Sequence, residues 1–129
     1  MDPHKIRELV LLLLYSFDIT EGEESDLMNL LKEECKVSGA FVEAALKRAQ
    51  TVVASLAQID EVLSKVSHGY SIERIHAVER NVLRLGIFEL LIEKELPQKV
   101  VIAEAKRLAK KFSTSEAATF VQALLLACV

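Results

Sequence analysis

The chain has 129 residues, of which 51% are hydrophobic and 27% are charged, and its formal net charge at pH 7 is −3. This composition excludes a disordered chain, and the length suits a single domain with its own hydrophobic core. The longest apolar run, Leu9–Tyr15, is too short to span a bilayer, so we expect no membrane partner.

The first helix is expected to begin at the N-terminus, with Asp2 as its N-cap and Pro3 as its first residue. Apolar residues then recur at helical spacing: Ile6, Leu9, Val10, Leu13, Leu14 and Phe17. An acidic loop follows at residues 21–25. We expect Ser25 to cap a second helix that reaches Cys35.

The pattern from Ala40 to about Val66 is also helical, and it fits either one long helix or two. Gly69 is expected to end it, and Ser71 to begin a short helical turn. Further helices are predicted from Ala77 to about Glu95, from Pro97 to Phe112, and through the last residues to Cys128. The sequence Ser-Thr-Ser-Glu at 113–116 matches a capping box, with the Ser113 hydroxyl and Glu116 each bonding a backbone amide.

No alternating strand pattern occurs, so the sequence predicts an all-α fold of six to seven helices in one domain, residues 1–129. The helix that contains Val78–Leu91 has apolar side chains all round, which predicts a central position. Arg80 and Arg84 share one stripe of this helix, which we interpret as its one wet side, with Glu79 near the edge. Glu89 projects among apolar residues. Because a bare buried charge is costly, we expect Glu89 to accept bonds from a helix N-terminus or an arginine.

The sequence contains no nucleophile elbow, phosphate-binding loop, dinucleotide fingerprint or zinc-ligand spacing. His76 and Glu79 lie one helical turn apart, and we interpret them as a surface contact rather than an acid–base pair. We therefore expect no catalytic residues, no metal site, no cofactor and no enzymatic activity. Cys35 and Cys128 are expected to be reduced thiols of a cytoplasmic protein.

Charge is unevenly spread along the chain. Residues 1–96 hold 11 Lys/Arg and 17 Asp/Glu, whereas residues 97–129 hold 5 Lys/Arg and 2 Asp/Glu. A polyanion would be repelled by much of the first part and tolerated by the last. Lys106, Arg107, Lys110 and Lys111 lie at helical spacing and are expected to form a basic patch.

Three blocks of the sequence carry a family resemblance: "HKIRELVLLLLYSFD" at 4–18, "ID" at 59–60 followed by "VERNVLRLGIFELL" at 78–91, and "LPQKVVIAEAKRLAKKFSTSEAATFVQALL" at 96–125. In their order and separation they resemble the NusB family of bacterial transcription antitermination factors. The resemblance implies two packed helical bundles without a catalytic site. It also implies pairing with the ribosomal protein NusE and binding of that pair to boxA RNA of nascent ribosomal RNA transcripts, within the transcription elongation complex. Because some relatives self-associate, the resemblance leaves a homodimer open.

Individual residues match positions to which the family gives roles. Cations at one helix end neutralise phosphates and release counterions, and an aromatic residue near the C-terminus is expected near RNA. The residues that match these RNA-binding positions are His4, Lys5, Arg7 and Phe120. The residues that match the partner-facing positions, or lie beside them, are Tyr15, Glu79 and Arg80.

The chain also departs from the family pattern. Its basic start is interrupted by Ile6, Ala103 stands where the family usually has Asn, and Gln122, Ala123 and Leu126 replace Asn, Gly and Asp. One alternative is therefore a protein-interaction helical module with weak or lost RNA binding. Another is a relative of the NusB-like domain of ribosomal RNA cytosine methyltransferases, which would need a cofactor-binding domain for which the chain has no room.

Overall fold

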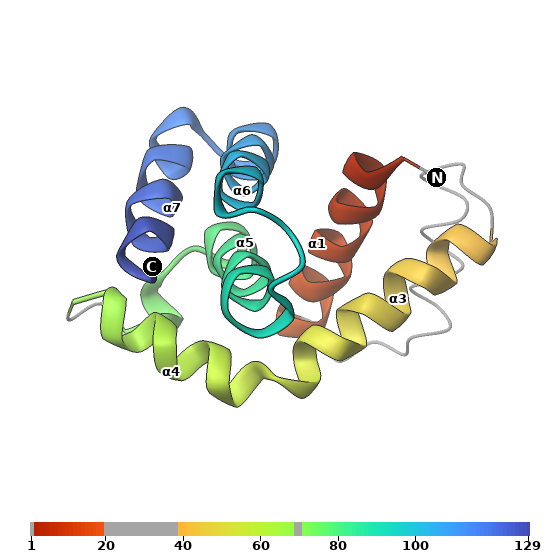
Figure 1. Cartoon of the computed structure of the whole chain (residues 1–129), viewed down its shortest axis with the longest axis horizontal. Helices are drawn as coiled ribbons and strands as arrows, with labels where there is room; N and C mark the ends of the chain where they lie inside the picture. Colours follow the sequence, from red (N-terminus) through yellow and green to blue (C-terminus); the bar gives the residue numbers. More distant parts are fainter. Residues whose placement is uncertain (1, 20–38, 69–70) are drawn as a thin grey trace. The chain divides into compact units, whose positions relative to one another are not determined.

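The structure is a computed structural model that describes residues 2–19, 39–68 and 71–129 (Figure 1). Throughout these residues the regular structure is helical, which confirms the predicted all-α class. The chain divides into two compact units, unit 1 at Met1–Val53 and unit 2 at Ala54–Val129, and each is described by itself. The single domain over residues 1–129 stays a prediction.

Unit 1 contains α1 (Pro3–Ile19) and nearly all of α3 (Gly39–Ala54). The predicted start of α1 is confirmed, because the backbone N–H of His4 donates to Asp2 Oδ1 at 3.0 Å. The buried residues of α1 all lie in its middle: Leu9, Val10, Leu11, Leu13 and Leu14. The helix predicted between Ser25 and Cys35 falls outside the described residues.

The helical pattern between Ala40 and Val66 forms two helices. α3 ends at Ala54, and α4 (Leu56–Val66) begins after Ser55, whose backbone leaves the helical conformation. Val42, Ala45, Ala49 and Val52 are buried at intervals of three or four residues, as expected for a helix with one apolar face. The end of α4 comes before Gly69, which is itself outside the described residues.

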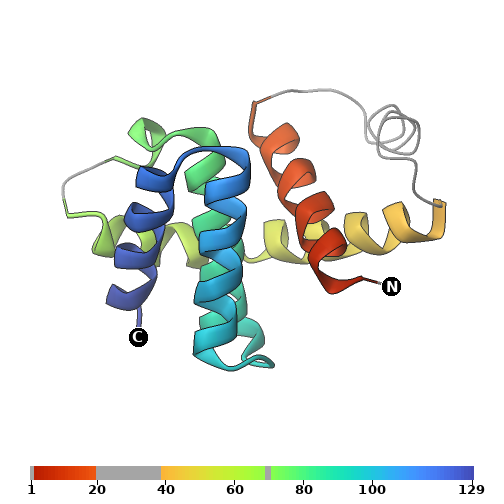
Figure 2. The ribbon, with the colours of Figure 1, turned by 90° about the horizontal axis from the view of Figure 1, so that it is seen from above.

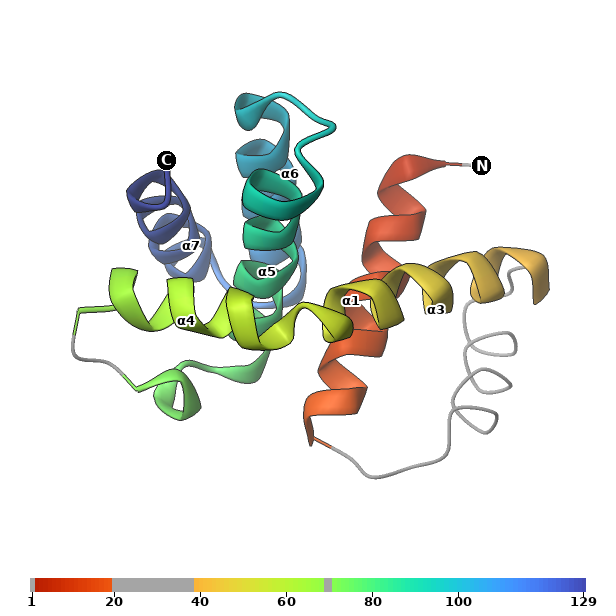
Figure 3. The same cartoon turned by 60° about the horizontal axis from the view of Figure 1, so that its bottom comes forward.

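Unit 2 is built around α5 (Ala77–Ile87), which contacts α4, α6 (Gln98–Phe112) and α7 (Ser115–Ala127). Figure 2 shows α6 and α7 side by side, and Figure 3 shows α4 running across α5. Every residue from 81 to 89 is buried. The predicted central position of this helix is therefore confirmed, and the apolar side chains around its whole circumference are explained by packing on several sides.

The segment after α5 winds differently from the continuous helix that the sequence predicts. It is a π-helix, η2 (Phe88–Glu93), and the N–H of Lys94 donates across five residues to the carbonyl of Glu89 at 3.1 Å. Lys94 then takes a left-handed conformation, with φ 55°, and ends the element. Glu89 is 2% exposed, so its predicted burial is confirmed, whereas its predicted bonding partner stays a prediction.

The cap of α7 is one residue later than the capping-box pattern predicts. The hydroxyl of Thr114 accepts from the N–H of Ala117 at 3.0 Å. Ser113 is instead the residue that ends α6, and its N–H donates to the carbonyl of Ala109 at 2.9 Å. The predicted Ser113 cap is therefore wrong, and Glu116 lies at the second rather than the third position of α7.

Candidate functional site

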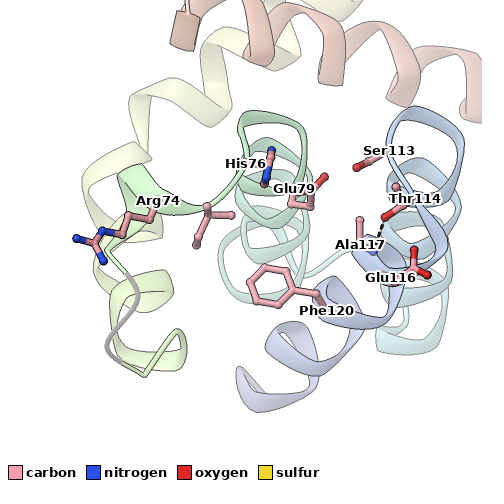
Figure 4. A pocket seen from close by; sticks show the side chains of 9 residues that line it. Arg74, His76, Glu79, Ser113, Thr114, Glu116, Ala117 and Phe120 are labelled. Atoms are coloured by element: carbon pink, nitrogen blue, oxygen red, sulfur yellow. Dashed lines mark hydrogen bonds between the residues drawn. The ribbon is translucent and has the colours of Figure 1, made fainter.

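Unit 2 contains a pocket of about 390 Å³ between the start of α5 and the start of α7. One wall comes from the 3₁₀ turn η1 (Ile72–Arg74) and the first turn of α5, and the other from the α6–α7 connection and α7 (Figure 4). The lining residues are Arg74, Ile75, His76, Glu79, Ser113, Thr114, Glu116, Ala117 and Phe120.

Glu79 lies in this pocket as a buried carboxylate. It is 7% exposed, and its Oε1 atom accepts no hydrogen bond from the described part of the chain. The prediction that Glu79 lies at the edge of a wet stripe is therefore wrong. The α6–α7 connection, distant in sequence, lines the same pocket as Glu79. An unsatisfied buried oxygen costs roughly 1–3 kcal/mol, so the pocket favours an incoming hydrogen-bond donor.

Phe120 supplies the apolar part of the pocket. Its half-buried ring reaches from α7 into the pocket, whose other wall carries Glu79 on α5 (Figure 4). Glu116 adds a second, exposed carboxylate at the start of α7. Arg74 extends away from the other labelled side chains in Figure 4. A carboxylate beside an aromatic ring suits a cationic group, since both attract positive charge.

Arg80 stabilises the wall of the pocket that η1 and the first turn of α5 form. Its Nη1 atom donates to the carbonyl of Ile75 at 2.8 Å and to that of Ile72 at 3.2 Å. The two carbonyls belong to the first residue of η1 and to the residue that follows it, so Arg80 fixes both ends of this turn against α5. Ile75 and His76, which follow η1, are thereby held in the pocket lining.

The prediction that Arg84 lies on a solvent-exposed side of α5 is wrong. Arg84 is 8% exposed, and its guanidinium forms a bidentate pair with Asp60 of α4: Nε lies 2.9 Å from Oδ1, and Nη2 lies 2.9 Å from Oδ2. The side of α5 that carries Arg84 therefore faces α4 rather than water. Within the Ile59–Asp60 pair of the family resemblance, Ile59 is a core residue and Asp60 is the counter-charge for Arg84.

The structure brings together Glu79 and Phe120, which the resemblance links to different partners. Of the residues predicted on α1, His4 and Lys5 are exposed, whereas Arg7 and Tyr15 are half-buried. These four belong to unit 1 and the pocket belongs to unit 2. The sequence did not reveal the pocket, because Glu79 and Phe120 lie 41 positions apart and no local motif joins them.

Metal-ligand clusters, free thiols and apolar helices are the other features that would bear on function among the described residues. The described residues contain no group of three or more His, Cys, Asp or Glu side chains that could hold a metal ion. Cys128 is a free thiol whose Sγ donates to the carbonyl of Leu124 at 3.3 Å, and burial raises its pKa. Among the described helices, none has both the length and the apolar character needed to cross a membrane.

Comparisons with known proteins agree with the sequence motifs. The profile of the NusB family matches residues 4–129. The transcription antitermination protein NusB of Chlamydia pneumoniae is 36% identical over 121 residues, which cover 94% of this chain and 76% of that protein. A chain in the crystal structure of a plectonemic RNA supercoil is 31% identical, with a TM-score of 0.86 and coverage of 98% of this chain and 94% of the other. A chain in the crystal structure of the antitermination factors NusB and NusE in complex with dsRNA is 30% identical, with a TM-score of 0.82 and coverage of 99% and 97%. The chain described here therefore belongs to the NusB family.

Proposed function

We propose that this chain is a transcription antitermination factor that pairs with the ribosomal protein NusE and binds boxA RNA of nascent ribosomal RNA transcripts. The observation that carries the proposal is its similarity, over nearly its full length, to a chain of the NusB–NusE complex with dsRNA. The protein acts as a cytoplasmic adaptor within the transcription elongation complex, and it catalyses no reaction. Membership of a family of antitermination proteins supports this role.

The pocket around Glu79 is the contact that we assign to NusE within unit 2. A lysine or arginine side chain of the partner would give Oε1 the donor that it lacks within the described residues. The same cation would lie near the Phe120 ring, which attracts positive charge through its π-face. Arg80 contributes to this partner surface indirectly, by holding η1 and the following residues in place.

RNA binding is assigned to the start of α1 and to Phe120. His4 and Lys5 are exposed and Arg7 is half-buried, so the first two turns of α1 present positive charge to solvent. Phosphate groups of an RNA strand would replace the counterions around these side chains, and the release of those ions favours binding. Tyr15 on the same helix is assigned to NusE. Phe120 lies in the pocket with Glu79, so RNA and NusE are expected to approach one another near this ring.

The first test compares single substitutions in binding assays with NusE and with boxA RNA. Glu79→Gln keeps the shape of the side chain but removes its charge, and we expect it to weaken the affinity for NusE at least tenfold. The reason is that loss of one member of a desolvated charge pair costs roughly 2–5 kcal/mol at an interface. Glu61→Gln on α4 is the matched control, since Glu61 is largely exposed and its pair with Lys65 lies on the surface.

Arg7→Ala is expected to leave the affinity for NusE unchanged and to weaken capture of boxA RNA by the pair. Unchanged NusE affinity in Glu79→Gln would remove the pocket from the partner surface. A chain that binds NusE tightly but retains no RNA, alone or in the pair, would favour the alternative of a protein-interaction module. That alternative is supported by the net charge of −3.

A further inference from the structure

The solvent-facing side of α6 carries positive charge and no carboxylate. All five Lys and Arg residues of positions 97–129 lie on this helix, at Lys99, Lys106, Arg107, Lys110 and Lys111. At 100° per residue they fall within an arc of about 140°. The one acidic residue of the helix, Glu104, is 7% exposed. Figure 2 shows this helix along its length. Its solvent-facing side is therefore positively charged, although the net charge of the chain is negative.

Two of the five cations have partners within the helix. Arg107 Nε donates to Glu104 Oε2 at 2.7 Å, so this guanidinium neutralises the buried carboxylate. The ammonium of Lys111 lies 5.6 Å from the centroid of the Phe112 ring, within the range of a cation–π contact. These two side chains therefore have local roles, although the sequence pattern places them in the same basic patch as Lys106 and Lys110.

The remaining cations form the α6 lysine row, which we define as Lys99, Lys106 and Lys110. Their positions lie within a stripe only about 40° wide, with successive spacings of about 10 Å and 6 Å along the helix axis. Lys99 and Lys110 are exposed and Lys106 is half-buried. The exposed Ala103 lies between the first two, so no bulky side chain interrupts the row.

We propose that the α6 lysine row binds consecutive phosphates of an RNA strand, as an RNA contact additional to the start of α1 and Phe120. This inference rests on the proposed RNA-binding function and adds a surface to it. Lysine is depleted at the centres of protein–protein interfaces, where aromatic side chains are enriched, and the row has no aromatic residue within it. Flexible ammonium groups without a large apolar anchor suit a polyanion, because each can follow a phosphate as a point charge.

The test compares two triple variants that change the net charge equally. Lys99→Gln, Lys106→Gln and Lys110→Gln together remove the row, whereas Lys47→Gln, Lys65→Gln and Lys94→Gln remove three exposed lysines from other elements. The affinity of each protein for boxA RNA in the presence of NusE is measured over a series of salt concentrations. We expect loss of the row to reduce the slope of log affinity against log salt by about 2, since each phosphate contact on a single strand contributes about 0.7.

We further expect the row variant to bind RNA at least tenfold more weakly than the control triple at low salt, with the same affinity for NusE. If the wild-type protein binds RNA and the two triple variants have equal salt slopes and equal RNA affinities, the proposal that the row binds RNA is overturned. The proposed function would not be affected by that result. A row variant that loses NusE and keeps its RNA slope would also overturn the proposal for the row, in favour of an acidic protein surface. A wild-type chain that binds no RNA in the presence of NusE would overturn both.

Discussion

Arg84 and Asp60 show how a single charged pair joins two elements of unit 2. Both guanidinium contacts are 2.9 Å long, and the two side chains are 10% and 25% exposed. Arg84 Nη1 also approaches Asn81 Oδ1 at 3.4 Å. A charge removed from water in this way depends on its partner, because the partner replaces the lost hydration. The pair therefore links α4 to α5 through two charge-assisted hydrogen bonds.

Replacement of Arg84 by Ala is expected to lower the free energy of unfolding by about 3 kcal/mol. The reason is that Asp60 would be left partly buried without its counter-charge. Urea denaturation of Arg84→Ala, Asp60→Ala and the double variant gives the coupling energy of the pair. The same cycle on Glu61 and Lys65, which are 69% and 73% exposed, serves as the control and should give a coupling of only about 0.3–0.5 kcal/mol. Equal coupling energies in the two cycles would contradict the structural role of the buried pair.

The hydroxyl groups at the start of α7 offer a second test on single residues. Thr114→Ala removes the acceptor for the N–H of Ala117 and is expected to destabilise the protein by about 1 kcal/mol. Ser113→Ala leaves that bond intact, and we expect little change in the thermal midpoint. The two variants each remove one hydroxyl group, at neighbouring positions. The variant with the lower thermal midpoint therefore identifies the residue that caps α7, which is Thr114 in the structure and Ser113 in the capping-box pattern. A larger loss in Ser113→Ala would reverse the assignment.

At the scale of elements, the contact between α5 and α7 depends on a glycine. A Cβ atom added to Gly86 would lie 3.0 Å from both Cδ atoms of Leu125, whose side chain is fully buried. Glycine is unfavourable inside a helix, where it costs about 1 kcal/mol relative to alanine. Its presence here is explained by the close approach of the two helices, since any side chain would displace Leu125.

Gly86→Ala is expected to destabilise the protein by about 1 kcal/mol. The overpacking against Leu125, worth roughly 1–3 kcal/mol, exceeds the gain in helix propensity. In a Leu125→Ala background the clash is absent, and the same substitution should instead stabilise the protein by about 1 kcal/mol. Chemical denaturation of the four proteins measures this reversal. A substitution that has the same sign in both backgrounds would show that the α5–α7 contact does not require glycine.

The winding of α5 and η2 shows a limit of helical periodicity. Apolar side chains from Val78 to Leu91 predict one buried helix, and the burial is as expected. The change from α- to π-winding at Phe88 was not predicted, because a change from four-residue to five-residue hydrogen bonds leaves the apolar character of the sequence unaltered. Lys94 ends the element in a left-handed conformation that composition alone does not indicate, since glycine and asparagine are the usual residues there.

At the scale of the whole molecule, unit 2 presents two surfaces of opposite charge. The pocket contains the unsatisfied carboxylate oxygen of Glu79 with Glu116 nearby, whereas α6 carries the lysine row. Opposite charges on one unit suit two different partners, a basic protein segment and a polyanion, and disfavour exchange between them. The proposed pairing with NusE and RNA fits this distribution of charge.

The sequence by itself determined the helical class, the start of α1, the central position of α5 and the family to which the chain belongs. These properties follow from periodic apolar positions, from capping residues and from short motifs, all of which act over a few residues. The choice of Thr114 over Ser113 as the cap of α7 is also local, a bond over three residues that the sequence pattern places one position too early. Tertiary structure alone decided that Arg84 faces Asp60 and that Glu79 and Phe120 share a pocket. Each of these two pairs joins residues that are far apart in the chain, so the environment of a charge appears only when the helices have packed.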